Sequence, residues 1–280
     1  MKKYKKLIIF SILLLALTGC TQVIDPQTKQ VYADKIISLG DSWTWGSDTW
    51  FGALFVWPIA QALNFFSQYV GTIGSIVVVT LIIKIITIKG SIKATVQQQK
   101  MQLIGPEQAR IEAKYQGRND QQAKLQKATE MQKLFEKHEI NPMGALGGTF
   151  LQLPIMIAMY QAVMRSEAII NGTVFGQTLE LTPMQGFTQG NIIIIGIFIL
   201  MALSQFLSMF LPQYLAKQKI RKRSYEKQPA NQANMMMYSS LIMIVVLALN
   251  WQVGMSLYWM VSALAQLVQT LFINHKYGAK

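Results

Sequence analysis

Lys84 is the one charged side chain within a stretch of sequence that is apolar enough to cross a membrane. It stands between Thr80 and Thr87, and the spacing i, i+4, i+7 places all three on one face of a helix. A lysine at the centre of a membrane helix costs about 2.5–3.5 kcal/mol, so it is a candidate functional group that attracts acidic ligands. The alternative is that Lys84, four residues from Ile88, extends its long side chain to the membrane surface.

Other apolar stretches also carry polar or aromatic residues at helical spacing. They are Gln152, Gln161, Ser204, Gln205, Ser208, Trp259, Ser262, Gln266 and Gln269. Any one of them can be an ordinary hydrogen-bond partner between helices. However, these stretches contain no Asp or Glu to pair with Lys84, and a dry bundle would leave its charge unpaired. We therefore expect a water-filled polar groove, open to the cytoplasm, that offers a positive charge to an acidic and transient ligand.

The composition is typical of a membrane protein. Of the 280 residues, 51% are hydrophobic and 14% are charged, whereas soluble domains carry about 25% charged residues. One Cys and two His exclude a disulfide scaffold and a Cys/His zinc site, and the chain has no nucleotide-binding P-loop. We expect neither a cofactor nor an enzymatic activity. The net charge of +13 would suit a nucleic acid, but its distribution follows membrane topology, so we expect no direct nucleic acid partner.

Five stretches have the length of a membrane-spanning helix, which needs about 17–25 residues. We predict spans at residues 70–88, 145–164, 191–211, 234–250 and 255–273. The last two are separated only by a tight turn, so they form a hairpin. The predicted fold is an all-α polytopic membrane protein whose five transmembrane helices form the groove.

The positive residues between the predicted spans give the orientation, because cytoplasmic loops are rich in Lys and Arg. Residues 89–144 hold ten of them and residues 212–233 hold six, whereas segments 20–49 and 165–190 together hold three. We predict that the two rich segments and the tail 274–280 face the cytoplasm. The N-terminal segment and the 165–190 loop then lie outside.

The N-terminus has the pattern of an export signal. Four Lys within residues 2–6 precede the apolar run Leu7–Leu17, which is too short to span a bilayer. Small residues then precede Cys20, an arrangement that resembles a bacterial lipobox. We expect a signal peptide at residues 1–19 and a lipid anchor on Cys20 at the outer leaflet. The alternative is an ordinary signal peptide followed by an incidental Cys.

Residues 50–69 are apolar and aromatic, but Pro58, Gln61 and Asn64 interrupt them. We expect an amphipathic helix that lies in the outer membrane interface. A sixth span is the alternative, which the polar interruptions and the Asp-rich sequence before them disfavour.

Residues 91–115 and 120–139 are polar and rich in helix-forming residues, with a turn signal between them. They predict a cytoplasmic hairpin of two antiparallel helices, whose first arm Pro106 should bend or break. The apolar stripe of the second arm is narrow and consists of Leu125, Thr129, Met131, Leu134 and Phe135. We therefore expect a mobile hairpin. The alternative is a solvated linker without a special role.

Two stretches of the sequence resemble a known family. Residues 141–165 begin Asn-Pro-Met-Gly and continue as an apolar run, and they resemble the second-span signature of the YidC/Oxa/Alb membrane protein insertases. Residues 257–262 resemble the last-span motif of that family. The lipobox, the five predicted spans and the hairpin after the first span match its Gram-positive bacterial branch. The resemblance extends over about residues 45–275.

The resemblance implies an insertase that receives nascent membrane proteins in the groove and releases their spans into lipid, independently of the Sec translocon or beside it. It aligns the groove arginine of the family with Lys84, and groove-facing residues with Gln205 and Trp259. A lysine retains the charge but loses the two-pronged geometry of guanidinium. The hairpin resembles the substrate-receiving element of the family. The ribosome is a further implied partner, although the tail 274–280 is much shorter than the basic ribosome-binding tails of some members.

Two other classes of function stay open. A cation in a polar groove also suits a small-anion transporter or channel, although five spans do not divide into two matching inverted halves. A membrane scaffold lipoprotein would need no groove charge, and Lys84 would then be dispensable. In each case the predicted location is the bacterial plasma membrane, with the N-terminus outside and the C-terminus in the cytoplasm.

Overall fold

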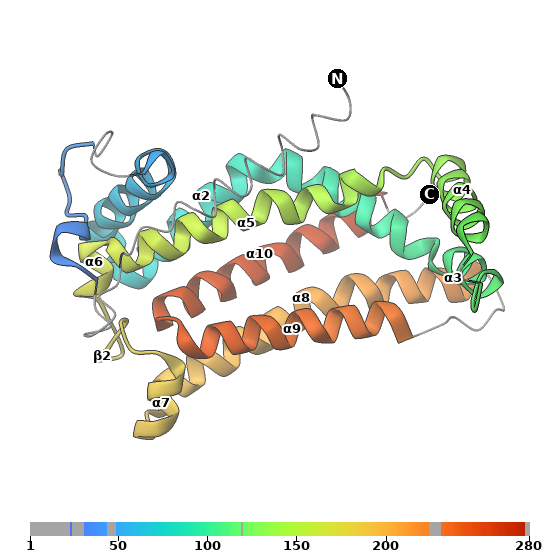
Figure 1. Cartoon of the computed structure of the whole chain (residues 1–280). Coiled ribbons are helices and arrows are strands. Elements are labelled where there is room, and N and C mark those ends of the chain that lie inside the picture. Colours follow the sequence, from blue (N-terminus) through green and yellow to red (C-terminus); the bar gives the residue numbers. More distant parts are fainter. Residues whose placement is uncertain (1–22, 24–30, 44–48, 119, 224–230, 278–280) are drawn as a thin grey trace. The chain divides into compact units, whose positions relative to one another are not determined.

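The computed structural model describes residues 23, 31–43, 49–118, 120–223 and 231–277, without the side chains of 143, 145–151, 219–223, 231–236 and 277. The predicted signal peptide and Cys20 lie outside the described residues. Within them the chain is largely helical, as an all-α fold requires (Figure 1). The one sheet in the described part is a short antiparallel pair, β1 (Thr173–Val174) and β2 (Gln177–Thr178).

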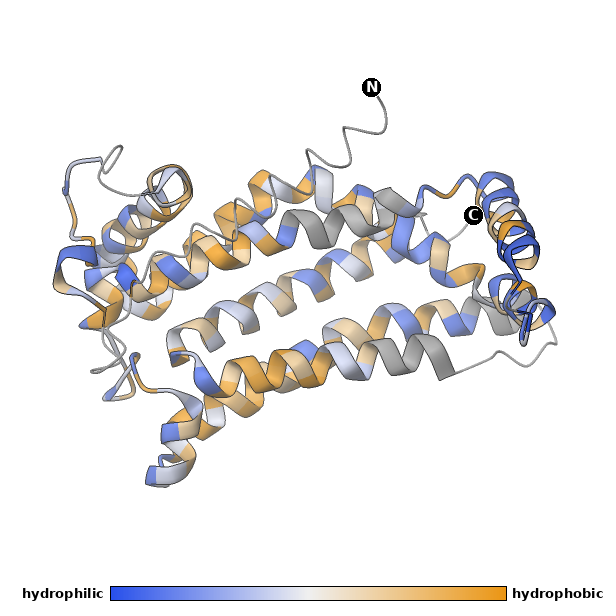
Figure 2. Cartoon of the chain, viewed as in Figure 1, coloured by the Kyte–Doolittle hydropathy of each residue, from blue (hydrophilic) through white to orange (hydrophobic). Residues whose placement is uncertain are grey.

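Five long helices account for most of the chain. They are α2 (Trp57–Leu103), α5 (Pro142–Arg165), α8 (Ile192–Arg223), α9 (Asn231–Asn250) and α10 (Val253–Tyr277). Apart from Asn191, each predicted span lies within one of them, and Figure 2 shows hydrophobic residues along their length.

The length and composition of the described helices allow a coarser statement about membrane spans. Three helical stretches are long and apolar enough to cross a membrane, namely Gly52–Leu103, Ile192–Gln218 and Val253–Lys276. Met237–Asn250 is a shorter apolar helix. The chain is therefore an α-helical protein with several candidate spans, and the number of five crossings stays a prediction.

The chain divides into two compact units. The first contains residues 1–83, 152–201 and 247–261, and the second contains residues 84–151, 202–246 and 262–280. Each long helix except α9 therefore contributes a substantial part to both units, with Lys84 as the first residue of the second unit.

A kink divides α2 near the start of the first predicted span. Gly71 has φ 71° and ψ 173°, a conformation that glycine adopts without the steric cost of a side chain. The helical segment before the kink begins with a π-helical turn, Gly52–Val56. It carries exposed apolar side chains, including Phe65 and Tyr69. The interfacial position of this segment stays a prediction, but the kink permits it a direction different from that of the span.

In the first unit, three segments that are distant in the sequence are joined by hydrogen bonds around Asn64. The Asn64 amide donates to the Ile37 carbonyl at 2.7 Å, and its oxygen accepts from Ser166 Oγ at 2.6 Å and from the Ala168 N–H at 3.0 Å. Ile37 also forms a parallel β-bridge with Ser166. Ser166 lies between α5 and the short helix α6 (Glu167–Ile170). We call residues 36–41 the strap, because these bonds hold it on the helices.

Further contacts fix the strap. Gln61 donates to the Ser38 carbonyl at 2.8 Å and accepts from the Gly40 N–H at 3.2 Å. Just before the strap, the short 3-10 helix Ala33–Lys35 ends where Arg165 Nε donates to the Lys35 carbonyl at 2.8 Å. The polar residues that interrupt the 50–69 segment therefore bind the strap rather than face lipid.

In the second unit, the predicted hairpin forms as two helices, α3 (Gly105–Lys114) and α4 (Gln121–Lys137). Pro106 breaks the first arm as predicted, because α2 ends at Leu103 and α3 begins with the proline in its first turn. The Asp120 side chain accepts a hydrogen bond from the Ala123 N–H and caps α4.

The hairpin has a small apolar core. Its buried residues are Ile104, Leu134 and Ile140, and Met101, Ile111, Met131 and Phe135 pack against them. The predicted stripe was wrong at its first two positions, since Leu125 is 63% exposed and Thr129 is exposed as well. Residues 104 and 140 supply the missing apolar contacts from outside the two helices, and this cluster lies at the C-terminal end of α4.

Candidate functional site

Lys84 is a half-buried side chain on α2. Among the residues that the structure describes, no carboxylate forms an ion pair with its ammonium group and no side chain forms a hydrogen bond with it. Thr80, one turn before it, is buried, and its hydroxyl has no hydrogen-bond partner within the described part of the chain. The Thr87 hydroxyl donates to the Lys84 carbonyl at 3.4 Å.

The second unit also contains Gln205, Ser208, Ser262 and Gln266. Gln205 and Gln266 are half-buried, whereas Ser208 and Ser262 are buried. The Ser208 hydroxyl donates to the Gln205 carbonyl at 2.8 Å, so it serves its own helix. No hydrogen bond between described residues joins Lys84 to either glutamine. That Lys84 and these four residues line one groove therefore stays a prediction.

The first unit contains Gln152 and Trp259. Gln152 Nε2 donates to Tyr258 Oη at 3.1 Å, which is a hydrogen bond between α5 and α10. Trp259 is only 5% exposed. Within this unit, Gln152 therefore forms a hydrogen bond between two helices, and the Trp259 side chain is buried.

The environment of Trp259 is a column of three aromatic rings. Its ring stacks on that of Trp251 with centroids 5.1 Å apart, and Trp251 stacks on Tyr160 with centroids 4.3 Å apart. The column joins α5, the turn between α9 and α10, and the start of α10. Helical spacing does not predict this column, because neither the turn residue Trp251 nor Tyr160 shares a helical repeat with Trp259.

A polar contact in the second unit was also missed. Gln269 Nε2 donates to Ser91 Oγ at 2.8 Å and to Thr95 Oγ1 at 3.2 Å, which joins α10 to the part of α2 beyond the predicted span. The spacing of the residues in the sequence could have predicted this contact. Ser91 and Thr95 continue the polar face of Lys84 at i+7 and i+11, and Gln269 follows Gln266 by three residues.

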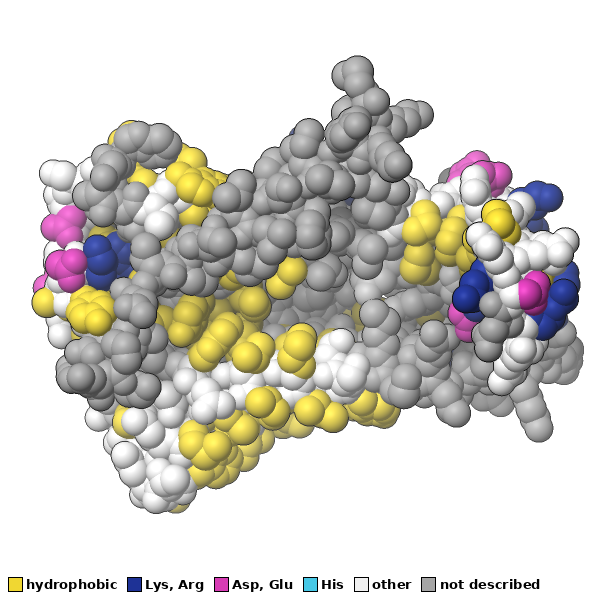
Figure 3. All heavy atoms as spheres, viewed as in Figure 1, with side chains coloured by type: hydrophobic (Ala, Val, Ile, Leu, Met, Phe, Trp, Pro, Cys, Tyr) yellow, Lys and Arg dark blue, Asp and Glu magenta, His cyan; other side chains and the backbone are white. Residues whose placement is uncertain are grey.

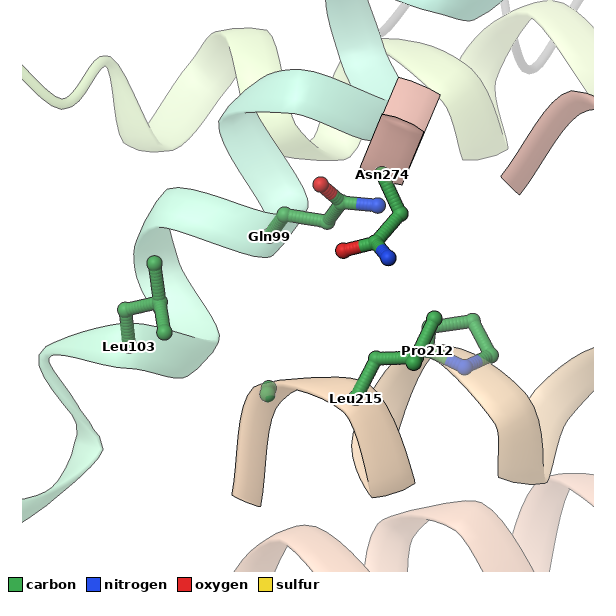
Figure 4. Close-up of a pocket in the computed structure, with 6 residues that line it drawn as sticks. Gln99, Leu103, Pro212, Leu215 and Asn274 are labelled. Atoms are coloured by element: carbon green, nitrogen blue, oxygen red, sulfur yellow. The ribbon is translucent and has the colours of Figure 1, made fainter. Parts of the chain in front are cut away.

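A small hollow lies in the second unit, lined by Gln99, Leu103, Pro212, Leu215, Ala216 and Asn274. In Figure 4 the amides of Gln99 and Asn274 lie near each other, with the apolar side chains of Leu103, Leu215 and Pro212 around them. None of the predicted site residues lines this hollow, and its lining has no charged group. It is not a candidate for the binding of an acidic ligand.

Two ion pairs tie α3 to the α4 region of the hairpin, where charged side chains are concentrated (Figure 3). Glu107 lies 3.1 Å from Lys137 Nζ and 2.9 Å from His138 Nε2. Partial burial raises the pKa of the Glu107 carboxyl, but the contacts with His138 and Lys137 outweigh it, so the pKa lies below its usual value.

The second ion pair joins Lys114 to Glu130, which also accepts from Tyr115 Oη at 2.9 Å. The hydrogen bonds from Lys114 and Tyr115 lower the pKa of the Glu130 carboxyl, and the bond to Glu130 raises the pKa of the Lys114 ammonium group. Both ion pairs therefore favour the ionised form of the glutamates. In the described residues, no group of three or more His, Cys, Asp or Glu is placed to hold a metal ion.

Comparisons with known proteins agree on one family. The sequence profile described as "60Kd inner membrane protein" matches residues 65–280. The chain is 28% identical to "Membrane protein insertase YidC 2" of Bacillus anthracis, over 98% of this chain and 94% of that protein. It is 27% identical to "Membrane protein insertase MisCA" of Bacillus subtilis (strain 168), over 92% of this chain and 86% of that protein.

A mycoplasmal relative is longer than this chain. "Membrane protein insertase YidC" of Mycoplasmopsis pulmonis (strain UAB CTIP) is 29% identical over 86% of this chain, and the match covers 40% of that protein. The "Membrane protein insertase YidC" of Ureaplasma parvum serovar 3 is 28% identical, and the match covers 63% of that protein. The chain therefore spans less than two thirds of the length of these two relatives.

Proposed function

The chain belongs to the 60Kd inner membrane protein family, and from this premise we propose that it is a membrane protein insertase. The names of its Bacillus relatives, which match over nearly their whole length, support this function. The proposed substrates are nascent membrane proteins. The activity needs no bond-making chemistry, because its product is the same polypeptide in a different environment.

The proposed mechanism rests on the charge of Lys84. An acidic, short segment of the substrate enters a polar groove from the cytoplasm and is attracted to the Lys84 ammonium group. Gln205, Gln266 and neighbouring hydroxyls replace part of the water that the segment loses, which lowers the cost of burying polar groups. The apolar span of the substrate then partitions into lipid, and the burial of its apolar surface drives the process.

The proposed topology has five spans, a cytoplasmic C-terminus and an outer N-terminus with a lipid on Cys20. The excess of Lys and Arg in residues 89–144 and 212–233 supports this orientation. In the same proposal the 50–69 segment lies in the outer interface. The protein is then a multi-pass protein of the bacterial plasma membrane.

We further propose that α3 and α4 receive the substrate before it enters the groove. The polar surface of the hairpin and its position in the chain directly after the Lys84 helix support this role. The Sec translocon and the ribosome are candidate partners at this side of the membrane.

One observation above all supports the proposal. In a chain of this family, Lys84 is half-buried and has no ionic partner among the described residues. The test is reconstitution of the purified protein in liposomes. A single-span substrate with an acidic tail is added, and protection of the tail from external protease is measured. We expect protection that depends on the protein and that decreases in Lys84→Ala. A matched substrate with a neutral tail should lose less of its protease protection in Lys84→Ala.

Two results would contradict the mechanism. Equal loss for acidic and neutral tails in Lys84→Ala would exclude electrostatic attraction as the role of Lys84. No protection beyond that of empty liposomes would exclude an autonomous insertase and favour an assistant of the Sec translocon or a scaffold.

A further inference from the structure

The loop between α5 and α8 contains a turn with an unusual residue. Thr173 pairs with Thr178 and Val174 with Gln177, so Phe175 and Gly176 form a two-residue hairpin turn. Both turn residues have positive φ, 48° for Phe175 and 80° for Gly176. Such turns favour Asn-Gly or Asp-Gly, and a bulky side chain at positive φ is strained. Phe175 thus destabilises the turn in which it stands.

Packing within the protein does not compensate for this strain. The Phe175 side chain is 81% exposed, whereas Val174 beside it is 2% exposed. The hairpin itself is well fixed, since Leu179 is fully buried and its N–H donates to the Gly172 carbonyl at 3.1 Å. The ring is therefore held outward by an ordered hairpin. Strained residues that persist in ordered structure are often functional.

The same loop presents three more exposed apolar side chains. Met184 and Phe187 on α7 (Pro183–Gln189) are 45% and 46% exposed, and Ile192 at the start of α8 is 83% exposed. We call Phe175, Met184, Phe187 and Ile192 the loop apolar surface.

The helix α7 is fixed at both ends. A capping box between Thr182 and Gln185 begins it, and the Phe187 ring packs edge-on against Phe198 of α8. Gly186 lies so close to Ile194 that a Cβ atom would stand 2.6 Å from its side chain. The exposed side chains of α7 are thus held next to the first turns of α8.

We propose that the loop apolar surface inserts into the phospholipid leaflet in which α8 begins. Three observations favour lipid over a protein partner. Ile192 of this surface is the first residue of α8, which is long and apolar enough to cross a membrane. Residues 171–191 contain one charged residue, the half-buried Glu180, and no Lys or Arg that would orient a protein partner. Aromatic and apolar side chains at a polar loop are typical of segments buried at the headgroup boundary.

The test uses a fluorophore that reports its surroundings. Cys20→Ser removes the only cysteine, and Phe175→Cys then allows a single nitrobenzoxadiazole label. The protein is reconstituted in phosphatidylcholine and phosphatidylglycerol vesicles with nitroxide on the acyl chains, and aqueous iodide is the opposing quencher. Gln189→Cys is the matched control, because Gln189 is an exposed polar residue of the same loop.

We expect lipid nitroxide to quench the label at 175 at least threefold more than the label at 189, and iodide to do the reverse. Equal quenching of both labels by iodide would overturn the proposal. A label at 175 that is shielded from iodide but not quenched by lipid nitroxide would also overturn it, in favour of contact with a second copy of the chain, the only protein present.

A second variant separates lipid contact from folding. Phe175→Asn supplies a residue that the turn prefers, so we expect an unchanged or higher Tm in detergent. In vesicles the same variant should reduce the lipid quenching of a label at Met184→Cys. A lower Tm together with unchanged lipid quenching of the label at 184 would mean that the Phe175 ring stabilises the folded protein itself, which contradicts its role as a lipid contact.

Discussion

Asn64 offers a quantitative test of the contacts that hold the strap. Its side chain is 3% exposed and forms hydrogen bonds with Ile37, Ser166 and Ala168. Asn64→Ala removes all three and leaves the buried Ile37 carbonyl without the amide. Each such hydrogen bond contributes about 1 kcal/mol. The bond to Ile37 acts on the strap directly. The other two act indirectly, because they fix Ser166 and Ala168 beside the backbone groups of Arg165 and Glu167 that bond to Ile37. The strap should therefore be destabilised by about 1–3 kcal/mol.

The assay is limited trypsin digestion of the detergent-solubilised protein, with cleavage after Lys35 followed by mass spectrometry. When the strap closes faster than trypsin cuts, the cleavage rate follows the open population. A weakening of this size raises that population about 5- to 150-fold, because every 1.4 kcal/mol is a factor of ten. Cleavage after Lys124, on the exposed surface of α4, should not change and provides the internal reference.

Gln61→Ala is the matched control. Gln61 is half-buried and makes two hydrogen bonds to the strap, at 2.8 and 3.2 Å, which water can replace. We expect an increase in cleavage below about tenfold, corresponding to less than about 1.4 kcal/mol. An unchanged rate in Asn64→Ala, or a larger effect in Gln61→Ala, would refute the argument that buried hydrogen bonds hold the strap.

Other substitutions test the charge of Lys84, the aromatic column and the ion pairs of the hairpin. Lys84→Arg should retain insertion of acidic-tail substrates in the liposome assay, because attraction needs the charge; an inactive variant would mean that the groove fits only lysine. Trp251→Ala should lower stability against denaturing detergent by about 1–3 kcal/mol, since each of two ring pairs contributes about 0.5–1.5 kcal/mol, and Trp251→Phe should retain most of it. Finally, acid should separate α3 from α4. Glu107 and Glu130 have lowered pKa values in the folded hairpin, so they stabilise it above the ordinary glutamate pKa of 4.5, and this contribution is lost as the pH falls through the folded values. Spin-label distances between Gln108 and Gln132 should increase as the pH falls below 4.5. Substitution of both glutamates by Gln should abolish this pH dependence.

Local rules were sufficient for much of the fold. Pro106 marks the break before α3, and Asp120 caps α4, because each acts on its immediate neighbours. The five apolar stretches lie in helices for the same reason. Gly71 shows the limit of such rules. Gly74 lies in the same stretch with ordinary helical backbone, and nothing in the residues around Gly71 distinguishes it as the position of a kink.

The candidate site was less predictable, because its contacts depend on how helices are rotated against one another. The face that contains Thr80, Lys84 and Thr87 follows from helical spacing alone. The bond from Gln152 to Tyr258 does not, since it joins residues 106 positions apart. The sequence also indicated that Asn64 is unsuited to lipid, but not that its partner would be the strap. Leu125 illustrates the opposite error, in which an apolar residue at the expected spacing lies beyond the end of the core.

The unbroken helix between Lys84 and Leu103 makes this part of α2 a lever. At 1.5 Å per residue its 19 steps extend about 28 Å, and Pro106 comes only after its end. Because the helix is continuous over this length, a tilt imposed at the hairpin would move the lysine as well. Because Gln269 binds Ser91 and Thr95 partway along the rod, α10 supplies a point of support for such a rotation. If the hairpin receives the substrate as proposed, capture of a polypeptide there would be mechanically coupled to a movement of the Lys84 charge.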